Sequence, residues 1–173
     1  MKAGELTLQG TLTAQQQYII PIFQRYYTWD RKEWEQLWSD ICELHEKPGK
    51  RHFMGALVFV PNKKPVTYSY PTYQVIDGQQ RIITPSLLLT ALRDLASDAG
   101  YEELAGEITN SVLVHQYKQG IERFRVYPRQ RDREDFTSAV SGAGEPANRI
   151  GKPNTLNVVS CRYETKVRPS AKV

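Results

Sequence analysis

The chain has 173 residues, enough for one domain whose hydrophobic core needs no disulfide or metal to stabilise it. No apolar run approaches the ~18–20 residues of a transmembrane helix, and the N-terminus lacks an apolar signal core. The formal net charge is +4, but residues 145–173, with six basic and two acidic side chains, supply all of this excess. A basic pI on its own favours a nucleic-acid partner, whereas the neutral body of this chain gives no such indication.

Cysteine and histidine usage narrows the class of protein further. Two cysteines, Cys42 and Cys161, are typical of a chain kept reduced in the cytoplasm rather than of a disulfide framework. Three histidines and no close Cys/His spacing argue against a structural zinc site. Neither GxxxxGK[ST] nor GxGxxG is present, so the common phosphate loops are absent. We therefore predict a cytoplasmic protein without a membrane partner.

Apolar periodicity predicts the elements of the first half. Residues 17–20 are typical of a short strand, which Pro21 ends. A helix follows over about 30–46, with Thr28 or Asp30 as its cap. Its apolar residues recur at helical spacing: Trp34, Leu37, Trp38, Ile41 and Leu44. The apolar segment 52–60 has strand length.

The second half opens with a short strand at 73–76. The pattern then becomes helical at Asp77 and Gly78, and a leucine-rich stripe runs to about 98–100. Pro85 interrupts this helix, so it could instead begin late, with Thr84 as its cap. Further elements are predicted at the following residues: helices over about 101–114 and 130–141, and a strand at 124–127.

Short strands alternating with helices indicate an α+β fold rather than a doubly wound sheet. After Ser141 the signals decay, because GAGEPANRIGKPNT has no period and many breakers. We therefore predict a domain over residues 1–142 and a basic, weakly structured tail over residues 143–173.

The segment VIDGQQR, residues 75–81, places polar groups where a strand becomes a helix. The first N–H groups of a helix lack internal partners and favour phosphate. Gly78 would let a ligand approach the backbone, the two glutamines after it would offer amide donors, and Arg81 a planar fork. Asp77 could hold Mg²⁺, orient a water or cap the helix. From spacing alone, a plain turn and helix cap explain Asp77 and Gly78 as well.

The second candidate is IPIFQRYYTW, residues 20–29. Aromatic residues interleaved with Gln24 and Arg25 could stack on bases while contacting phosphate. The alternative is an aromatic hinge packed on the core, with Arg25 in an ion pair. His52, at the start of an apolar strand, is more typical of a structural residue, and the mixed charges of residues 129–135 favour a solvated helix face.

Four blocks in this order resemble one family: IPIFQRYYTW with its Trp/Leu helix, HFMGALVF, QVIDGQQR with its Leu-rich helix, and PRQRDREDF. Over about residues 5–142 the chain resembles the N-terminal domain of GmrSD-type, modification-dependent restriction enzymes, a branch of the ParB/sulfiredoxin-like superfamily. The resemblance implies a ParB-like fold that binds and hydrolyses a nucleoside triphosphate. It also implies that hydrolysis is coupled to sensing or cutting modified foreign DNA, often phage DNA.

The resemblance also implies roles for individual residues. The residues that would bind the nucleotide are Gly78, Gln79, Gln80, Arg81 and Thr84. Hydrolysis would depend on Asp77, Gln80 and Arg81, with Mg²⁺ held at Asp77. The residues that would sense DNA or its modification are Gln24, Arg25, Tyr26 and His52.

The sequence departs from the family pattern in two ways. The family block continues as DGQQRxTTLxLL, whereas Ile83 and Pro85 interrupt it here. The HNH-type His/Asn nuclease site is absent from the chain, so the nuclease would be a separate domain or subunit. Family domains also continue with further helices, so a product truncated or frame-shifted after about residue 142 is one hypothesis.

Three functions stay open at this point. The first is a triphosphate-hydrolysing sensor domain of an anti-phage restriction system. The second is a switch module that binds nucleotide and DNA without turnover, and the third is an inactive truncated remnant. A stand-alone nuclease is less favoured, because no cluster of carboxylates or histidines suggests paired metals. The nucleotide, the DNA modification and assembly into a homo-oligomer are left undetermined.

Overall fold

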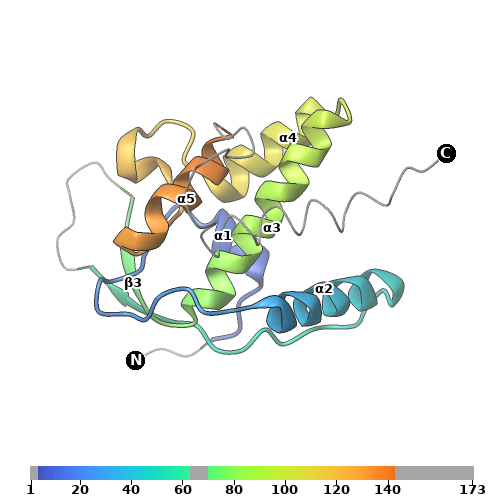
Figure 1. Ribbon diagram of the computed structural model, residues 1–173, viewed down its shortest axis with the longest axis horizontal. Helices are drawn as coiled ribbons and strands as arrows, with labels where there is room; N and C mark the ends of the chain where they lie inside the picture. The colour runs from blue at the N-terminus through green and yellow to red at the C-terminus, as the bar shows by residue number, and fades with distance from the viewer. Residues whose placement is uncertain (1–3, 63–69, 143–173) are drawn as a thin grey trace.

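The computed structural model describes residues 4–62 and 70–142, and the predictions for residues 143–173 lie outside them. The elements are α1 (Leu8–Thr13), β1 (Gln17–Ile19), α2 (Arg31–Glu46), β2 (Val58–Pro61), β3 (Thr72–Asp77), α3 (Gln79–Asp98), α4 (Glu102–Ile108), the π-helical turn η1 (Thr109–Leu113), the 3₁₀ turn η2 (Gly120–Arg123), β4 (Val126–Tyr127) and α5 (Gln130–Ser141). Within these described residues, five α-helices and a four-stranded sheet confirm the predicted α+β fold (Figure 1). Among the described helices, none combines the length and the hydropathy that crossing a membrane requires.

The sheet brings the carboxyl ends of three strands to one edge. Its strand order is β2-β3-β1-β4, with β1 parallel to both β3 and β4, and β2 antiparallel to β3. Tyr18 of β1 lies opposite Tyr73 on one side and Val126 on the other. The loop after β1, the turn after β3 and the start of α5 after β4 therefore converge. Such an edge is the usual ligand site of sheets built from parallel strands.

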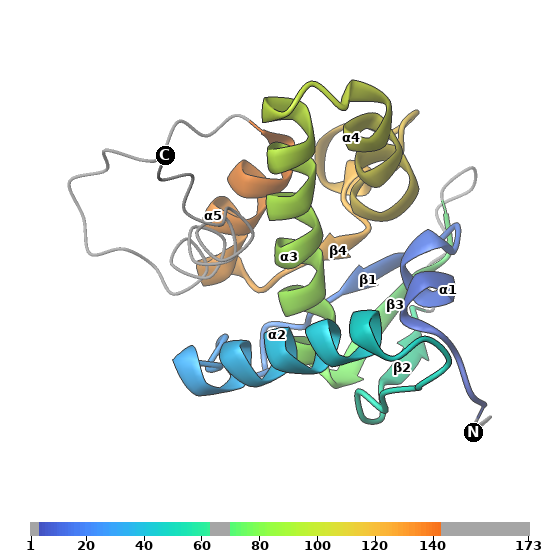
Figure 2. The same ribbon diagram turned by 90° about the vertical axis from the view of Figure 1, so that its right-hand side faces the viewer.

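Helix α3 forms the centre of the molecule. In Figure 2 it stands between α4 and α5, with α2 lying across its base. Ile82, Leu87 and Ala91 are fully buried in the main hydrophobic cluster, and each large side chain of this kind stabilises the fold by about 1.5–3 kcal/mol. Helix α3 is buried on more than one face, which explains why its sequence is leucine-rich rather than strongly amphipathic.

The alternative of a late helix start at Pro85 is wrong. Helix α3 begins at Gln79 and continues through Pro85, so Thr84 lies inside the helix and does not cap it. Proline costs about 3 kcal/mol in a helix interior. The first turn forms nevertheless, because Gln79, Gln80 and Thr84 are buried and hydrogen-bonded to the loop after β1.

Helix α2 confirms the prediction for residues 30–46 and selects Asp30 as its cap. The Asp30 carboxylate accepts a 2.9 Å bond from the Lys32 N–H, and Glu33 accepts a 3.0 Å bond from the Asp30 N–H. This reciprocal capping box fixes the entry into the helix. Trp34 and Leu37 are buried on its inner face, as the periodicity predicts.

Several elements differ from the sequence predictions, and the strand predicted at 124–127 is limited to β4. Helix α1 was not predicted, since it has six residues and depends on the Thr7 hydroxyl, which accepts a bond from Gly10. The strand predicted at 52–60 pairs only from Val58, because Gly55 adopts a φ of 97° and leaves the extended path. The helix predicted at 101–114 is α4 followed by a π-helical turn.

A buried basic pair lies near the amino end of β4. Arg125 donates to three carbonyl oxygens: Ala14 at 2.7 Å, and Val114 and Asn110 at 3.2 Å. His115 is 1% exposed, and its burial together with the neighbouring Arg125 lowers its pKa to about 4. Because the unfolded histidine takes up a proton near pH 6.5 and the folded one does not, stability is complete above that pH and declines towards pH 4.

We predict that the wild-type protein loses about 2 kcal/mol of unfolding free energy through His115 between pH 7 and pH 5. Urea unfolding of the wild type, His115→Phe and His45→Gln at both pH values measures this loss. His45 is exposed, so His45→Gln is expected to keep the wild-type pH dependence, whereas His115→Phe reduces it. An equal pH dependence in all three proteins would contradict the prediction.

Candidate functional site

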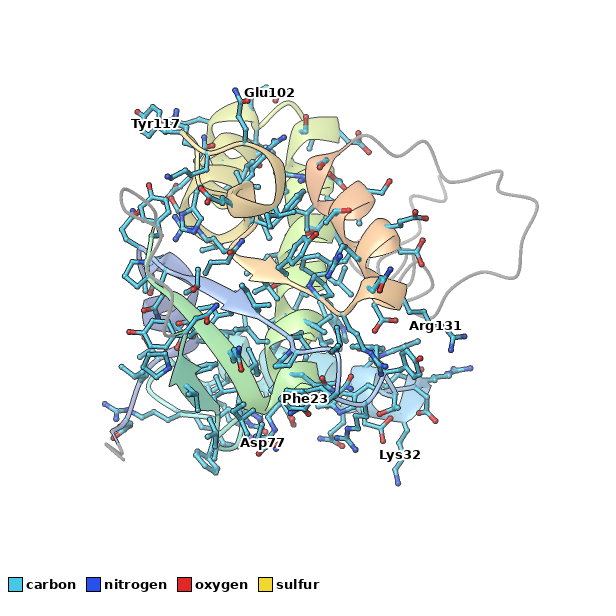
Figure 3. The ribbon with its side chains drawn as sticks, turned by 90° about the vertical axis from the view of Figure 1, so that its left-hand side faces the viewer. Phe23, Lys32, Asp77, Glu102, Tyr117 and Arg131 are labelled. Atoms are coloured by element: carbon cyan, nitrogen blue, oxygen red, sulfur yellow. The ribbon has the colours of Figure 1, made fainter. Side chains whose placement is uncertain are left out.

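The candidate site lies at the carboxyl edge of the parallel strands. The loop after β1 meets the turn after β3 there, and the Gln24 side-chain amide donates a 3.0 Å bond to the Ile76 carbonyl. Figure 3 shows Asp77, Phe23 and Arg131 along this edge. The structure therefore brings together the two sequence blocks that the motif analysis singled out.

The two glutamines of the turn hold the neighbouring loop. Gln79 Nε2 donates a 2.8 Å bond to the Arg25 carbonyl, and Gln80 Nε2 donates a 3.2 Å bond to the Tyr26 carbonyl. Gln80 Oε1 also accepts a 3.4 Å bond from the Thr28 N–H. Both side chains are buried. Their amide groups face the loop, and a nucleotide that reached them would have to displace these bonds.

Helix α5 holds the same loop from the other side. Asp132 Oδ2 accepts a 3.3 Å bond from the Tyr27 N–H, and Arg129 Nη1 donates a 2.7 Å bond to the Gln24 carbonyl. Burial raises the pKa of Asp132, which its bond from Tyr27 partly opposes. Residues 24–28 are thus fixed through their main chain by four side chains, and we refer to them as the clamped loop.

A buried hydroxyl pair ties the clamped loop to the core. Tyr27 Oη lies 2.7 Å from Thr84 Oγ1 and accepts a 2.9 Å bond from Trp34 Nε1. Burial raises the pKa of Tyr27 to about 12, so its hydroxyl stays protonated. Thr84 is completely buried, below the surface of the turn. Its predicted contact with a nucleotide stays a prediction.

Asp77 and Arg81 are the charged groups of the turn that solvent reaches. Their side chains are 61% and 29% exposed, and Arg81 Nη2 lies 3.8 Å from Asp77 Oδ2. Arg81 Nη1 donates to the Ala56 carbonyl, and its guanidinium packs on Gly55, where a Cβ would lie 3.1 Å from Cζ. Arg81 therefore presents a planar, fixed donor beside a carboxylate.

The donor set at the turn restricts how a metal could bind. Among the described residues, no group of three His, Cys, Asp or Glu side chains could hold a metal ion. Magnesium is often bound through one or two carboxylates together with the phosphates of a substrate. Asp77 fits such a role as a single ligand, so the residues suit Mg²⁺ only together with a triphosphate.

Gly78 is required by internal packing. Its φ is 89°, and a Cβ there would lie 2.4 Å from Leu57 Cδ2 and 3.1 Å from the Ala56 carbonyl. From the sequence, we expected the missing side chain of Gly78 to leave room for a ligand. In the structure, residues 56 and 57 occupy that room. The glycine allows the segment before β2 to lie against the start of α3.

The predicted sensing residues divide into two groups. Gln24, Arg25 and Tyr26 lie on the clamped loop, with Arg25 and Tyr26 exposed. His52 lies elsewhere, with Nε2 3.5 Å from an Asp40 carboxylate oxygen. The pair lines a hollow of about 250 Å³ between α2 and the segment before β2, together with Trp29, Lys32, Glu33, Gln36, Leu37 and Met54. The structure thus places His52 against α2 and not on the clamped loop.

Sequence reasoning missed Arg129 and Asp132, which hold the loop from α5. Their cluster was interpreted as a solvated helix face. A signal was available, because Asp132 shares helical spacing with two apolar residues, Phe136 and Val140. In the structure all three are buried on one face of α5.

We predict that Gly78→Ala destabilises the fold more than Gly100→Ala does. Both glycines have positive φ, which costs about 1–2 kcal/mol for alanine, but Gly100 has no atom within 4 Å of its would-be Cβ. The clash with Leu57 and Ala56 adds about 1–3 kcal/mol. Urea unfolding of both variants measures the difference, and equal losses would show that packing against residues 56 and 57 does not restrict this position.

Comparison with known proteins agrees with the motifs. The family model for the N-terminal domain of the GmrSD restriction endonuclease matches residues 8–169. The match continues past residue 142, and the domain boundary and the ParB-like superfamily stay predictions. No curated protein matches the chain. The matched residues span most of the chain, so it belongs to the family of GmrSD restriction endonuclease N-terminal domains, and this membership implies a role in a restriction system.

Proposed function

We propose that the chain is the sensor domain of a modification-dependent DNA restriction system in the cytoplasm, and that it binds and hydrolyses a nucleoside triphosphate. One observation carries this proposal. Gln79 and Gln80, which follow the exposed Asp77, make their hydrogen bonds to the main chain of the clamped loop. The candidate nucleotide turn and the candidate DNA-sensing loop are therefore joined by direct bonds.

The turn offers suitable chemistry for phosphate. Helix α3 begins at Gln79 and has no side chain capping its first N–H groups, which favour an anion together with the positive end of the helix dipole. Arg81 adds a planar donor that is fixed against Gly55. Asp77 is the exposed carboxylate beside it, placed to hold Mg²⁺ or to orient the attacking water.

Hydrolysis at this turn would be an in-line displacement. Water attacks the γ-phosphorus, the bond to the bridging β–γ oxygen breaks, and the proton of the water passes to Asp77 or to solvent. Arg81 would stabilise the charge that develops on the phosphoryl oxygens. Bound Mg²⁺ would neutralise part of the triphosphate charge.

The clamped loop offers suitable chemistry for DNA. It exposes Arg25 and Tyr26, and Phe23 just before it is 70% exposed. Aromatic rings beside arginine contact bases and phosphates together. Because Gln79 and Gln80 fix the carbonyls of Arg25 and Tyr26, a nucleotide that moves the turn would also move the loop. Cleavage of the sensed DNA would fall to an HNH-type nuclease domain or subunit.

The second candidate is a switch module that binds nucleotide without hydrolysing it. The donor set favours it, since Asp77 is a single carboxylate and no three-ligand metal group exists among the described residues. Isothermal titration calorimetry with each triphosphate, followed by a phosphate assay over hours, separates the two candidates. Binding without phosphate release would support the switch.

We predict that Asp77→Ala and Arg81→Ala each lower phosphate release by at least about 100-fold. Arg81→Ala removes the donor that stabilises the developing phosphoryl charge, and Asp77→Ala removes the group that holds Mg²⁺ or orients the water. The assay uses every common triphosphate with Mg²⁺, with and without modified DNA. Glu103→Ala, an exposed carboxylate on α4, is the matched control and is expected to keep the wild-type rate.

Thermal melting must accompany the Arg81→Ala assay, since Arg81 also contacts Gly55 and Ala56. Wild-type rates in both variants would refute the assignment of hydrolysis to this turn. Loss of hydrolysis in the Glu103→Ala control as well would also count against it.

A further inference from the structure

Helix α5 separates its charges between the surface and the interior. The segment RQRDRED has mixed signs, and its sequence is typical of a balanced, solvated face. In the structure, Asp132 and Asp135 are only 8% and 7% exposed, and Asp132 is bonded to the clamped loop. Of the arginines in this segment, Arg131 is exposed, whereas Arg129 and Arg133 are half-buried along aromatic rings. The first two turns of α5 therefore present a positive surface, with Glu134 as their exposed acidic side chain.

Aromatic rings hold the arginines of this surface in place. The guanidinium carbons of Arg129 and Arg131 lie 4.0 Å and 4.9 Å from the centre of the Tyr26 ring. Arg133 lies 4.2 Å from the centre of the Tyr127 ring. Stacked guanidinium groups lose little further freedom on binding. Arg129 donates one of its bonds to the Gln24 carbonyl, and its other donors are available to a ligand.

No carboxylate forms an ion pair with these groups within the described part of the chain. None of its ion pairs involves Arg25, Arg129, Arg131 or Arg133. By contrast, Arg31 and Arg51, on α2 and before β2, are each paired with a glutamate. Among the described arginines without an ion pair, Arg125 is buried and Arg123 lies apart in η2, whereas the other four gather at the start of α5 and on the clamped loop.

We propose that Arg25, Arg129, Arg131 and Arg133, which we call the arginine row, bind the phosphate backbone of double-stranded DNA. The proposal rests on the proposed function in taking DNA as the partner. Unpaired guanidinium groups suit a chain of phosphates, each of which accepts two parallel hydrogen bonds from such a fork. Exposed Phe23 lies along the same edge as Arg131 and supplies an apolar contact for sugar or base (Figure 3).

The arginine row would position the DNA and not read its sequence. Phosphate contacts fix orientation and make affinity depend on salt, whereas base or modification readout needs contacts in the grooves. The clamped loop, which Arg129 of this row holds through the Gln24 carbonyl, would then face the groove. In this proposal, the arginine row attracts the DNA backbone and the clamped loop senses the DNA modification, on one continuous surface.

The test is fluorescence anisotropy of the full 173-residue chain with a labelled, unmodified 25-base-pair duplex and no nucleotide, at 50–200 mM KCl. Arg131→Glu and the double variant Arg25→Glu/Arg131→Glu are expected to bind about tenfold or more weakly at 100 mM KCl. Their log–log salt slopes should fall by about 0.9 for each phosphate that the variant no longer neutralises. Arg131→Lys keeps the charge and is expected to stay close to the wild-type slope.

Arg123→Glu is the matched control, because Arg123 lies in η2, which precedes the amino end of β4, away from the carboxyl ends of the parallel strands. It changes the net charge equally and is expected to leave the salt slope unchanged. If Arg123→Glu weakened duplex binding as much as Arg131→Glu, the effect would follow from net charge alone, and the proposal would be overturned. A wild-type salt slope in both variants that carry Arg131→Glu would overturn it as well. Tighter binding of poly-glutamate than of the duplex would indicate that the arginine row binds an acidic protein segment, and it would also overturn the proposal.

The assay contains no nucleotide, so failure of the nucleotide proposal leaves its outcome unaffected. Conversely, a chain that releases phosphate but shows no salt-dependent duplex binding would overturn the arginine row alone. Thermal melting of each variant confirms that the compared proteins are folded. Arg131 is suited to this design, since it is exposed and stacks on the Tyr26 ring at the surface of the described structure.

Discussion

The main-chain N–H and C=O groups of a loop have no partners from a strand or helix and need other hydrogen bonds. In residues 24–28, side chains of other segments provide these bonds. Gln79 and Gln80 of α3 serve three of these groups, and Arg129 and Asp132 of α5 serve two more. Removal of one partner would leave a buried polar group unpaired, at about 1–3 kcal/mol. The edge of the sheet, both helices and the loop therefore form one unit, and the candidate site depends on it.

This arrangement gives the DGQQR segment two physical roles. Its glutamines are buried and bind the loop, while Asp77 and Arg81 face solvent. A ligand bound to Asp77 and Arg81 would lie next in sequence to Gln79 and Gln80, whose side chains bind the carbonyls of Arg25 and Tyr26. Under the proposed function, coupling between nucleotide and DNA needs no long pathway, because the same short segment carries the exposed pair and the bonds to the loop.

Features set by neighbouring residues could be predicted from the sequence, whereas features set by distant contacts could not. The start of α2 was predictable because Asp30, Glu33 and the apolar periodicity are local. The helical pattern from Gly78 was also predicted, but the sequence could not decide whether the helix passes through Pro85. That choice depends on bonds from Gln79 and Gln80 to residues more than 50 positions away. Likewise, the inward side of α5 depends on Tyr27, which lies 105 positions from Asp132. The two motif blocks were recognised, but their direct bonding was visible only in the fold.

The clamp on residues 24–28 reaches main-chain atoms almost exclusively, and this has an evolutionary consequence. Every residue type offers the same main-chain carbonyl, so Arg25 could be replaced without changing the path of the loop, and Tyr26 by another aromatic residue that keeps the stacking on Arg129. Relatives exposed to different invaders could diversify these side chains while retaining a common scaffold. An engineer could likewise randomise position 25, vary position 26 among aromatic residues, keep Gln79, Gln80, Arg129 and Asp132 constant, and select new specificities from the resulting library.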